Sequence, residues 1–548
     1  MAHALAGKPV QEQDIIDVQT IVDAYFDNVP DMTNPTQLVS FGTSGHRGTS
    51  VDGTFTELHV AAITQAICDG RKQFGATGPI FVGQDTHALS QPALVTVLEV
   101  LVGNGVTAMV DCDMDFVPTP SVSRAIIRYN EEHDDKADGI IITPSHNPPD
   151  NGGIKYNTII GGPADTVVTK WIEMRANEYL TAYCESEDFK RISIDNIEPT
   201  AQVPYDYKGL YVEELGDVIN MEAIKAAGPK VLVDTLGGSG ASYWNAIKER
   251  YGLDLTIIHD DYDPTFSFMT YDHDGKVRMD CSSTYVMASV INRIGDFDLA
   301  VGNDPDYDRY GIVVSSGLIS ANTFLTLAAR YLFTTRGWKN KGVGKTVVCT
   351  TMIDKWAADA ETPVFEVPVG FKYFSQLLFD GAIGIGGEES AGASFLKKDG
   401  TVWTTDKDGM IMALLSMEIM AVMGKSALKM ADESLEEFGN PSFGRIDAPC
   451  KKEQKQILKQ MSAELITATT VDGDPITNIR TTSLYNDMPI DGVRVETDKG
   501  WFVARPSGTE DLYKIYGESY KGDLGLVALL TAGEEIVNAA LNGTIETE

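Results

Sequence analysis

Short apolar runs recur along the chain in a regular plan. One begins at Gly78 (GPIFVG), one at Gly228 (GPKVLVD) and one at Gly344 (GKTVVC), and each is followed by a helical stretch, a second apolar run and a third. Continuous apolar runs of this length that alternate with helical stretches are typical of parallel strands buried on both faces. The pattern therefore predicts three related α/β domains.

The C-terminal part of the chain has a different pattern. The segment GVRVETDKGWFVARPSGTEDLYKIYGES alternates apolar and polar residues around a DKG turn, and DLGLVALLTAGEEIVNAAL has the character of a closing helix. Alternation of this kind indicates antiparallel strands, so a fourth, α+β domain is expected. The predicted domains are 1–205, 206–320, 321–440 and 441–548, with linkers around IEPTAQVPYDY, near Ser320 and at EFGNPSFGRIDAP.

The third apolar run of each repeat leads directly into a polar loop. These loops hold Ser145, Asp304 and Glu388. Ligands of open α/β sheets bind beyond the carboxyl ends of the strands. The predicted fold is therefore three similar α/β domains with mixed, mostly parallel sheets and a C-terminal α+β domain, arranged around a central cleft.

Composition and charge narrow the function. The 548 residues include 44 basic and 79 acidic side chains, a net charge of -35, and 43% are hydrophobic. This composition excludes global disorder and disfavours nucleic acid and anionic membranes as partners, and an anionic substrate would need a local positive field. The six scattered cysteines form no C-x-x-C pair, so zinc and redox motifs are not expected. The start of the sequence shows no signal-peptide pattern, and the most apolar stretch, Gly409 to Gly424, is short for a membrane span. We expect a cytoplasmic protein.

Two loops contain residues suited to catalysis. Ser145 stands on a turn stiffened by two prolines, with Lys155 and two glycines nearby, so it can act as a nucleophile or carry a phosphoryl group; the alternative is an ordinary turn with a capping serine. Asp304, Asp306 and Asp308 alternate after an apolar run and suit Mg²⁺; the alternative is a solvated acidic turn. An EF-hand is excluded because Arg309 stands where that loop needs glycine.

Three further loops suit sugar or phosphate binding. GIGGEESAGASF offers Glu388 and Ser390 to sugar hydroxyl groups, or is a flexible turn. RPSGTE, starting at Arg505, suits a phosphate, or connects a hairpin. TSGHRG places Arg47 between glycines within reach of an anion. The GKT at Gly344 is not a Walker A loop, because the required first glycine would fall at Lys339.

Together these loops resemble those of the α-D-phosphohexomutase superfamily, and within it of the bacterial phosphoglucomutases. TSGHRG, TPSHNPP, DPDYDRYG, GGEESAG and RPSGTE occur in the family's order along essentially the whole chain. The resemblance implies that Ser145 is the phosphoserine and that Asp304, Asp306 and Asp308, with a phosphate oxygen on Ser145, hold Mg²⁺. It also implies the remaining roles: Arg47, His146, Lys155 and Arg309 in catalysis, and Gly370, Lys372, Glu388, Ser390, Lys398, Arg505, Ser507, Gly508 and Thr509 in substrate binding.

The resemblance implies reversible conversion of glucose 1-phosphate to glucose 6-phosphate through glucose 1,6-bisphosphate, by phosphoryl transfer to and from Ser145. Phosphomannomutase and phosphoglucosamine mutase activity, a catalytically silent phosphosugar-binding protein and a phosphatase are the alternatives. Phosphosugars are the expected partners, and the sequence leaves monomer and homodimer both open. A swing of the last domain is a further hypothesis, because the intermediate has to turn between the two transfers.

Overall fold

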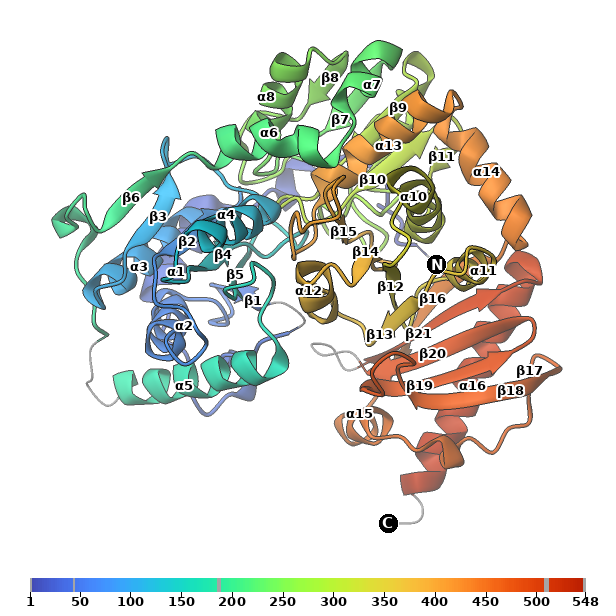
Figure 1. Ribbon diagram of the computed structural model, residues 1–548. Helices are drawn as coiled ribbons and strands as arrows, with labels where there is room; N and C mark the ends of the chain where they lie inside the picture. The colour runs from blue at the N-terminus through green and yellow to red at the C-terminus, as the bar shows by residue number, and fades with distance from the viewer. Residues whose placement is uncertain (1, 43–44, 185–188, 507–511, 546–548) are drawn as a thin grey trace. The chain divides into compact units, whose positions relative to one another are not determined.

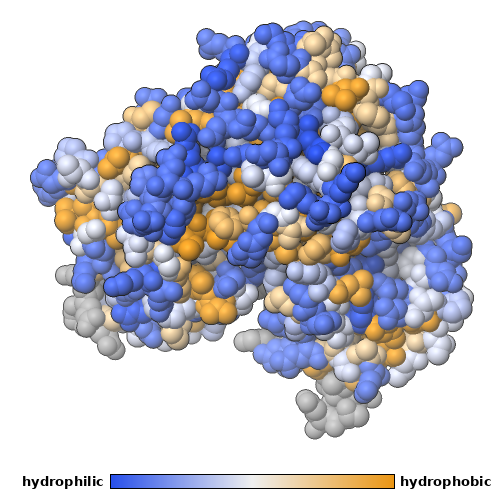
Figure 2. Space-filling view, in the orientation of Figure 1, coloured by the Kyte–Doolittle hydropathy of each residue, from blue (hydrophilic) through white to orange (hydrophobic). Residues whose placement is uncertain are grey.

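The computed structural model describes residues 2–42, 45–184, 189–506 and 512–545. The chain divides into two compact units, which are described separately. The first unit comprises Met1–Ser320, Phe374–Gly381 and Ser390–Leu428. The second unit comprises Ala321–Tyr373, Ala382–Glu389 and Lys429–Glu548. In Figure 2 hydrophilic residues cover much of the visible surface, as the acidic composition leads one to expect.

The first sheet, in the first unit, has six strands in the order β1-β5-β4-β2-β3-β6 (Figure 1). β2, β3, β4 and β6 run parallel, whereas β5 and then β1 are added antiparallel at one edge. The strands are β1 (His46–Thr49), β2 (Ile80–Gln84), β3 (Ala108–Asp111), β4 (Asp138–Ile142), β5 (Asn151–Asn157) and β6 (Gln202–Tyr205).

Helices cover both faces of this sheet. Ile140 and Ile142 of β4 belong to a core shared with α2, α3 and α5, whereas Ile141 points into a second core shared with α4. Consecutive strand residues point to opposite faces, so a strand buried on both sides is apolar at every position. The helices of this domain are α1 (Val18–Asp27), α2 (Glu57–Gly70), α3 (Ser90–Gly103), α4 (Thr119–Glu132) and α5 (Thr166–Cys184).

The second sheet, also in the first unit, has the order β11-β10-β9-β7-β8. Its strands are β7 (Val231–Asp234), β8 (Leu255–Ile258), β9 (Leu299–Gly302), β10 (Gly311–Val314) and β11 (Gly317–Leu318). Its helices are α6 (Tyr207–Val218), α7 (Met221–Ala227), α8 (Ala241–Tyr251) and α9 (Ala288–Ile291). β15 (Ala393–Phe395) and α13 (Gly409–Met423) come later in the chain but belong to this unit, and α13 packs on α7, β9 and β10.

The third sheet lies in the second unit, where β12 pairs in parallel with β13 on one side and β14 on the other. Its elements are α10 (Ala321–Arg336), β12 (Gly342–Thr346), α11 (Met352–Asp359), β13 (Val364–Val367), α12 (Lys372–Phe379), which continues into the first unit, and β14 (Ile383–Gly387). β12 ends at Thr346, whereas the sequence pattern placed this strand from Gly344 onward and so too late in the chain. Val347, Val348 and Cys349 follow β12 as a buried turn.

The parallel strands of the first three sheets share one order, which confirms the predicted repeat. In each, the first strand of the repeat lies between the second and the third: β3-β2-β4, β8-β7-β9 and β13-β12-β14. The third strand, namely β4, β9 or β14, ends just before Ser145, Asp304 or Glu388 respectively. The polar loops therefore follow equivalent strands in all three repeats.

The fourth sheet is antiparallel, as predicted, with the order β16-β21-β20-β19-β18-β17. Its elements are α14 (Ala427–Phe438), β16 (Ser442–Pro449), α15 (Lys452–Lys459), β17 (Thr470–Val471), β18 (Asp474–Thr482), β19 (Pro489–Thr497), β20 (Gly500–Pro506), β21 (Leu512–Ser519) and α16 (Gly522–Ile545). α16 is long and apolar enough to cross a membrane, but Leu529, Leu530, Val537 and Leu541 pack it against the sheet. Two predicted linkers were wrong in part, because they contain the edge strands β6 and β16.

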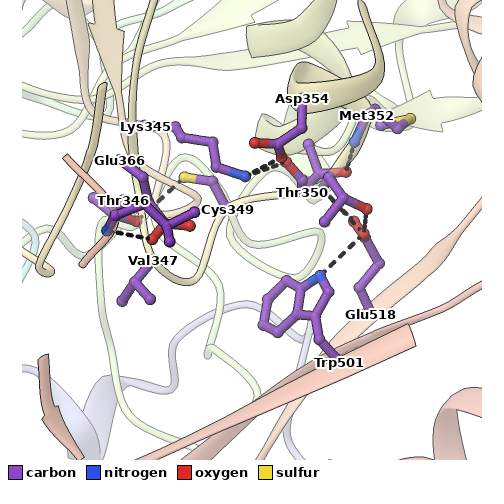
Figure 3. Close-up of polar contacts among 12 residues, drawn as sticks. Lys345, Thr346, Val347, Cys349, Thr350, Met352, Asp354, Glu366, Trp501 and Glu518 are labelled. Carbon is purple, nitrogen blue, oxygen red and sulfur yellow. Dashed lines mark hydrogen bonds and ion pairs between the residues drawn. The ribbon is translucent and has the colours of Figure 1, made fainter. Parts of the chain in front are cut away.

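The third and fourth sheets share a core within the second unit. Val347 and Val348 pack with Ile490, Trp501 and Val503. Figure 3 shows the Trp501 indole directed at the Glu518 carboxylate, which accepts its Nε1–H at 3.1 Å and the Thr351 N–H at 3.0 Å. A second link joins Glu366 of β13 to Arg480 of β18 in a two-pronged ion pair at 2.5 and 2.8 Å.

Candidate active site

Ser145 lies on a tight turn after β4. Its φ is +62°, in the left-handed region that costs a non-glycine residue roughly 1–3 kcal/mol, and strained positions of this kind concentrate at functional sites. The side chain is buried, with 1% of the residue exposed. β5 passes very close to this turn: a Cβ on Gly153 would lie 2.2 Å from Thr143 O, so glycine is required there. Ser145 is therefore positioned by the turn after β4 and by Gly153 of β5, which lets the two segments approach closely.

Three buried aspartates face Ser145 from the loop after β9. The ligand atoms of Asp304, Asp306 and Asp308 lie within 4.8 Å of one another. Ser145 Oγ donates to Asp304 Oδ2 at 2.9 Å, and Thr119 Oγ1 donates to Asp306 Oδ2 at 2.8 Å. Among the described residues, Oδ1 of Asp306 and of Asp308 finds no hydrogen-bond donor although it is buried. Crowded carboxylate oxygens without donors fit a hard cation such as Mg²⁺.

Like charges crowd this cluster. Burial, followed by the charges of Asp306 and Asp308, holds the pKa of Asp304 well above its ordinary value. Carboxylates this close cannot all ionise at low cost unless cations lie beside them. The aspartate cluster therefore needs counter-charges, and the first unit supplies several.

Two buried lysines and an arginine provide these charges. Lys155 of β5 donates to Asp306 at 2.5 Å and to Asp308 at 3.1 Å, and Lys407, in the turn before α13, lies 3.1 Å from Asp308. Burial opposes ionisation of Asp308, but Lys155, Lys407 and Arg309 outweigh it and hold the pKa of Asp308 well below its ordinary value. Together these cations offset the charges of the three aspartates beside Ser145.

His146 and Arg309 share a carboxylate. Arg309 Nη1 donates to Asp280 Oδ2 at 3.3 Å, and His146 Nε2 lies 3.9 Å from the same oxygen. Burial and the neighbouring Arg309 charge lower the pKa of His146 to about 3, so its imidazole is neutral near pH 7. Its Nδ1 lies 3.5 Å from Ser145 Oγ, and its carbonyl accepts the Met279 N–H at 3.1 Å. A neutral imidazole at this position can accept and return a proton.

Arg47 reaches the cluster from β1. It pairs with Gly153 of β5, and the carboxylates of Asp306 and Asp308 act on its side chain, although burial lowers its pKa overall. Thr43 and Ser44, the first two residues of the TSGHRG motif, lie outside the described residues.

The predicted substrate-binding residues fall in both units. In the first unit, Ser390 is half-buried, and Lys398 binds the end of α6, with its N–H donating to Asp217 O at 2.8 Å and its Nζ to Ile219 O at 3.5 Å. In the second unit, Glu388 follows β14, Gly370 has a φ of +131°, Lys372 begins α12, and the Arg505 Nε–H donates to Ile490 O at 2.9 Å. Ser507, Gly508 and Thr509 lie outside the described residues.

Several residues of the site carried no signal that our sequence analysis used. Lys407 stands in a polar TTDKDG segment, and only its position directly before an apolar helix marks it. Asp280 and Thr119 belong to no recognised motif, and each contacts the site from a loop or helix end far away in the sequence.

Comparison with known protein families matches the chain in four consecutive segments. Residues 38–182, 210–317 and 320–438 match the phosphoglucomutase/phosphomannomutase α/β/α domains I, II and III, and residues 447–524 match the C-terminal domain. A phosphoglucomutase from Komagataeibacter xylinus is 46% identical over 539 residues, which is 97% of each chain.

Solved structures agree on the fold. A putative phosphomannomutase from Thermus thermophilus is 23% identical with a TM-score of 0.72, over 91% of this chain and 99% of that one. The N-acetylphosphoglucosamine mutase of Aspergillus fumigatus, solved with GlcNAc-6P and magnesium, is 15% identical with a TM-score of 0.51, over 96% and 99%. With four matched domains and a relative of this identity along nearly its whole length, the chain belongs to the phosphoglucomutase/phosphomannomutase family.

Proposed function

We propose that the chain catalyses reversible conversion of glucose 1-phosphate to glucose 6-phosphate, with Ser145 as phosphoserine and glucose 1,6-bisphosphate as the intermediate. The observation that carries the proposal is the 2.9 Å contact between Ser145 Oγ and Asp304 Oδ2, inside a buried cluster of three aspartates and their cationic partners. The 46% identical phosphoglucomutase supports glucose as the sugar.

The proposed transfer uses Ser145 and His146. The 6-hydroxyl of glucose 1-phosphate attacks phosphorus, so that the O6–P bond forms while the bond from phosphorus to Ser145 Oγ breaks. The neutral His146 imidazole takes the hydroxyl proton and gives it to the departing Ser145 oxygen. After the bisphosphate has turned, the reverse steps return its other phosphoryl group to Ser145 and release glucose 6-phosphate.

Charge neutralisation is the main task of the surrounding residues, because phosphoryl transfer depends on positioning and electrostatics more than on covalent help. Lys155, Arg309 and Arg47 lie beside the cluster, and we assign them to the charge on the transferring group. Mg²⁺, when held by the three aspartates and a phosphate oxygen on Ser145, supplies further positive charge there. A fold neighbour solved with magnesium supports this choice of metal.

The remaining assignments concern the sugar, the phosphate that is not transferred, and the protein's domains, partners and location. We assign Gly370, Lys372, Glu388, Ser390 and Lys398 to the sugar, and Arg505, Ser507, Gly508 and Thr509 to the phosphate that is not transferred. The same proposal includes small-molecule phosphosugars as the partners, glucose 1,6-bisphosphate as an activator and a cytoplasmic location. It also includes the domain boundaries 1–205, 206–320, 321–440 and 441–548.

The test combines mass and turnover. The intact mass of purified protein should show one added phosphate on Ser145, and the protein should convert glucose 1-phosphate in Mg²⁺. Ser145→Ala should lose both. Ser416→Ala is the matched control, since Ser416 is equally buried but its hydroxyl only donates to Ala413 O within α13.

Each rival predicts a different result. Faster turnover of mannose or glucosamine phosphates would transfer the assignment to another phosphohexomutase, release of inorganic phosphate would indicate a phosphatase, and binding without turnover would indicate a silent phosphosugar-binding protein. Full activity of Ser145→Ala would refute the proposed mechanism.

A further inference from the structure

A buried carboxylate lies behind the Ser145 turn. Asp85, directly after β2, is fully buried and accepts four hydrogen bonds. Its Oδ1 accepts the Ser90 hydroxyl at 2.6 Å and the His87 N–H at 3.0 Å, and its Oδ2 accepts the Thr143 hydroxyl at 2.6 Å and faces His87 Nδ1 at 2.8 Å. Four donors around one carboxylate indicate the ionised form.

His87 is an imidazolium in this arrangement. Its Nδ1 faces the Asp85 carboxylate and its Nε2 faces Asn147 O at 3.0 Å. Both partners are acceptors, so both ring nitrogens have to carry protons. The electrostatics agree: burial lowers the pKa of His87, but the Asp85 charge outweighs burial and raises it overall.

The pair is connected to the backbone on both sides of Ser145. On one side, Thr143 Oγ1 donates to Asp85 and accepts the Ser145 N–H at 2.7 Å. On the other side, His87 binds the carbonyl of Asn147. The anchored residues stand two positions before and two positions after the left-handed Ser145, so the two contacts restrain the turn at both ends.

We propose that Asp85 and His87 are positioning residues that form a charged clamp, which holds Ser145 in its left-handed conformation with Oγ directed at Asp304. The inference rests on the proposed phosphoserine role of Ser145. Neither side chain needs to touch substrate. A nucleophile that moves by about 1 Å can lose roughly 100-fold in rate, so a clamp on the turn should affect the chemical step more than substrate binding.

The same sheet offers a matched control. Asp138, at the other end of β4, is also fully buried and pairs with Arg71 at 2.7 Å. Asp138→Asn removes a buried carboxylate of the same kind from the same sheet, at the end of β4 opposite the Ser145 turn. It should lower thermal stability and leave kcat and KM near those of the wild type.

The main experiment compares Asp85→Asn with this control. Asp85→Asn should lower kcat for glucose 1-phosphate roughly 10- to 100-fold while KM stays unchanged. Hydrogen exchange of the peptide that carries Ser145 should become faster in Asp85→Asn and not in Asp138→Asn, because the Ser145 amide loses a firmly held acceptor. Thr143→Val should act like Asp85→Asn, and Thr143→Ser, which keeps the hydroxyl, should restore most of kcat.

The outcomes separate the two proposals. If the wild type does not convert glucose 1-phosphate, the proposed function fails. Hydrogen exchange at the Ser145 peptide then still tests whether Asp85 and His87 restrain the turn. Equal exchange in wild type and Asp85→Asn, equal kcat loss in Asp85→Asn and Asp138→Asn, or a loss confined to KM would each overturn the clamp. If Asp85→Asn does not fold, the Thr143→Val and Thr143→Ser pair decides, and equal kcat in those two variants overturns it as well.

Discussion

Breaking the Glu366–Arg480 ion pair should destabilise the second unit. Only 2% of the Glu366 side chain and 9% of the Arg480 side chain are exposed, and their two contacts measure 2.5 and 2.8 Å. In Glu366→Gln the buried Arg480 loses both contacts with the Glu366 carboxylate and keeps Glu496, at 3.3 Å, as its charged partner. Removal of one member of a buried pair costs about 3–5 kcal/mol, and at a urea slope of about 3 kcal/mol per M the midpoint should fall by roughly 1–2 M.

The double replacement gives the decisive comparison. Glu366→Met combined with Arg480→Met removes both charges and fills similar volume, so the urea midpoint should return near the wild-type value. An exposed pair on the same sheet, Lys521 with Asp474 at 2.6 Å, is the control, because Asp474→Asn should cost about 1 kcal/mol or less. Urea unfolding followed by circular dichroism measures all four proteins.

Two results would contradict this reasoning. One is a Glu366→Gln midpoint equal to the wild type, which would show that the pair contributes nothing to the joint stability of the third and fourth sheets. The other is a double variant less stable than Glu366→Gln, which would show that the charges themselves, and not the cost of leaving one unpaired, stabilise the interface.

Three further predictions concern the first unit. Lys407→Met should lower kcat for glucose 1-phosphate roughly 100-fold in a steady-state assay, because Asp308 loses a cation 3.1 Å away; a folded variant with unchanged kcat would contradict this. Chelation of divalent metal should abolish turnover and added Mg²⁺ should restore it, and activity that survives chelation would refute the assignment of Asp304, Asp306 and Asp308. Burial lowers the pKa of His87, but Asp85, with a smaller contribution from Asp306, raises it overall. The charged imidazolium therefore stabilises the fold fully below the unfolded pKa of about 6.5, and this stabilisation is lost as pH rises through the folded pKa. The Tm advantage of wild type over His87→Gln, measured by calorimetry across pH, should therefore shrink toward alkaline pH, and an advantage that grows would contradict the assignment.

The repeat could be predicted from sequence because strands buried on both faces are apolar at every position. Ile140, Ile141 and Ile142 show this, since consecutive residues enter different cores. Edge strands carry no such signal. β6 and β16 have mostly half-exposed residues and contain prolines, so they resemble linkers until their hydrogen-bond partners are known.

The aspartate cluster was predictable because its three members alternate within one loop directly after an apolar run. Lys407 was not, because it stands 99 positions after Asp308 and only the packing of α13 brings the two together. The Asp85–His87 pair was hidden for a related reason. Its connection to Ser145 depends on the parallel pairing of β2 with β4, which places Gln84 beside Ile142.

The return of α13 to the first unit has a consequence for synthesis on the ribosome. Met410 to Ile419 of this helix are almost wholly buried, and the Gly409 N–H donates to Tyr307 O in the aspartate loop. A nascent chain that ends at Ser320 contains both sheets of this unit but lacks that helix, and the 103 residues from there to Met423 need roughly 5–20 s of translation. We expect the aspartate loop to stay open during this interval, so that the site is completed only after most of the third repeat has emerged.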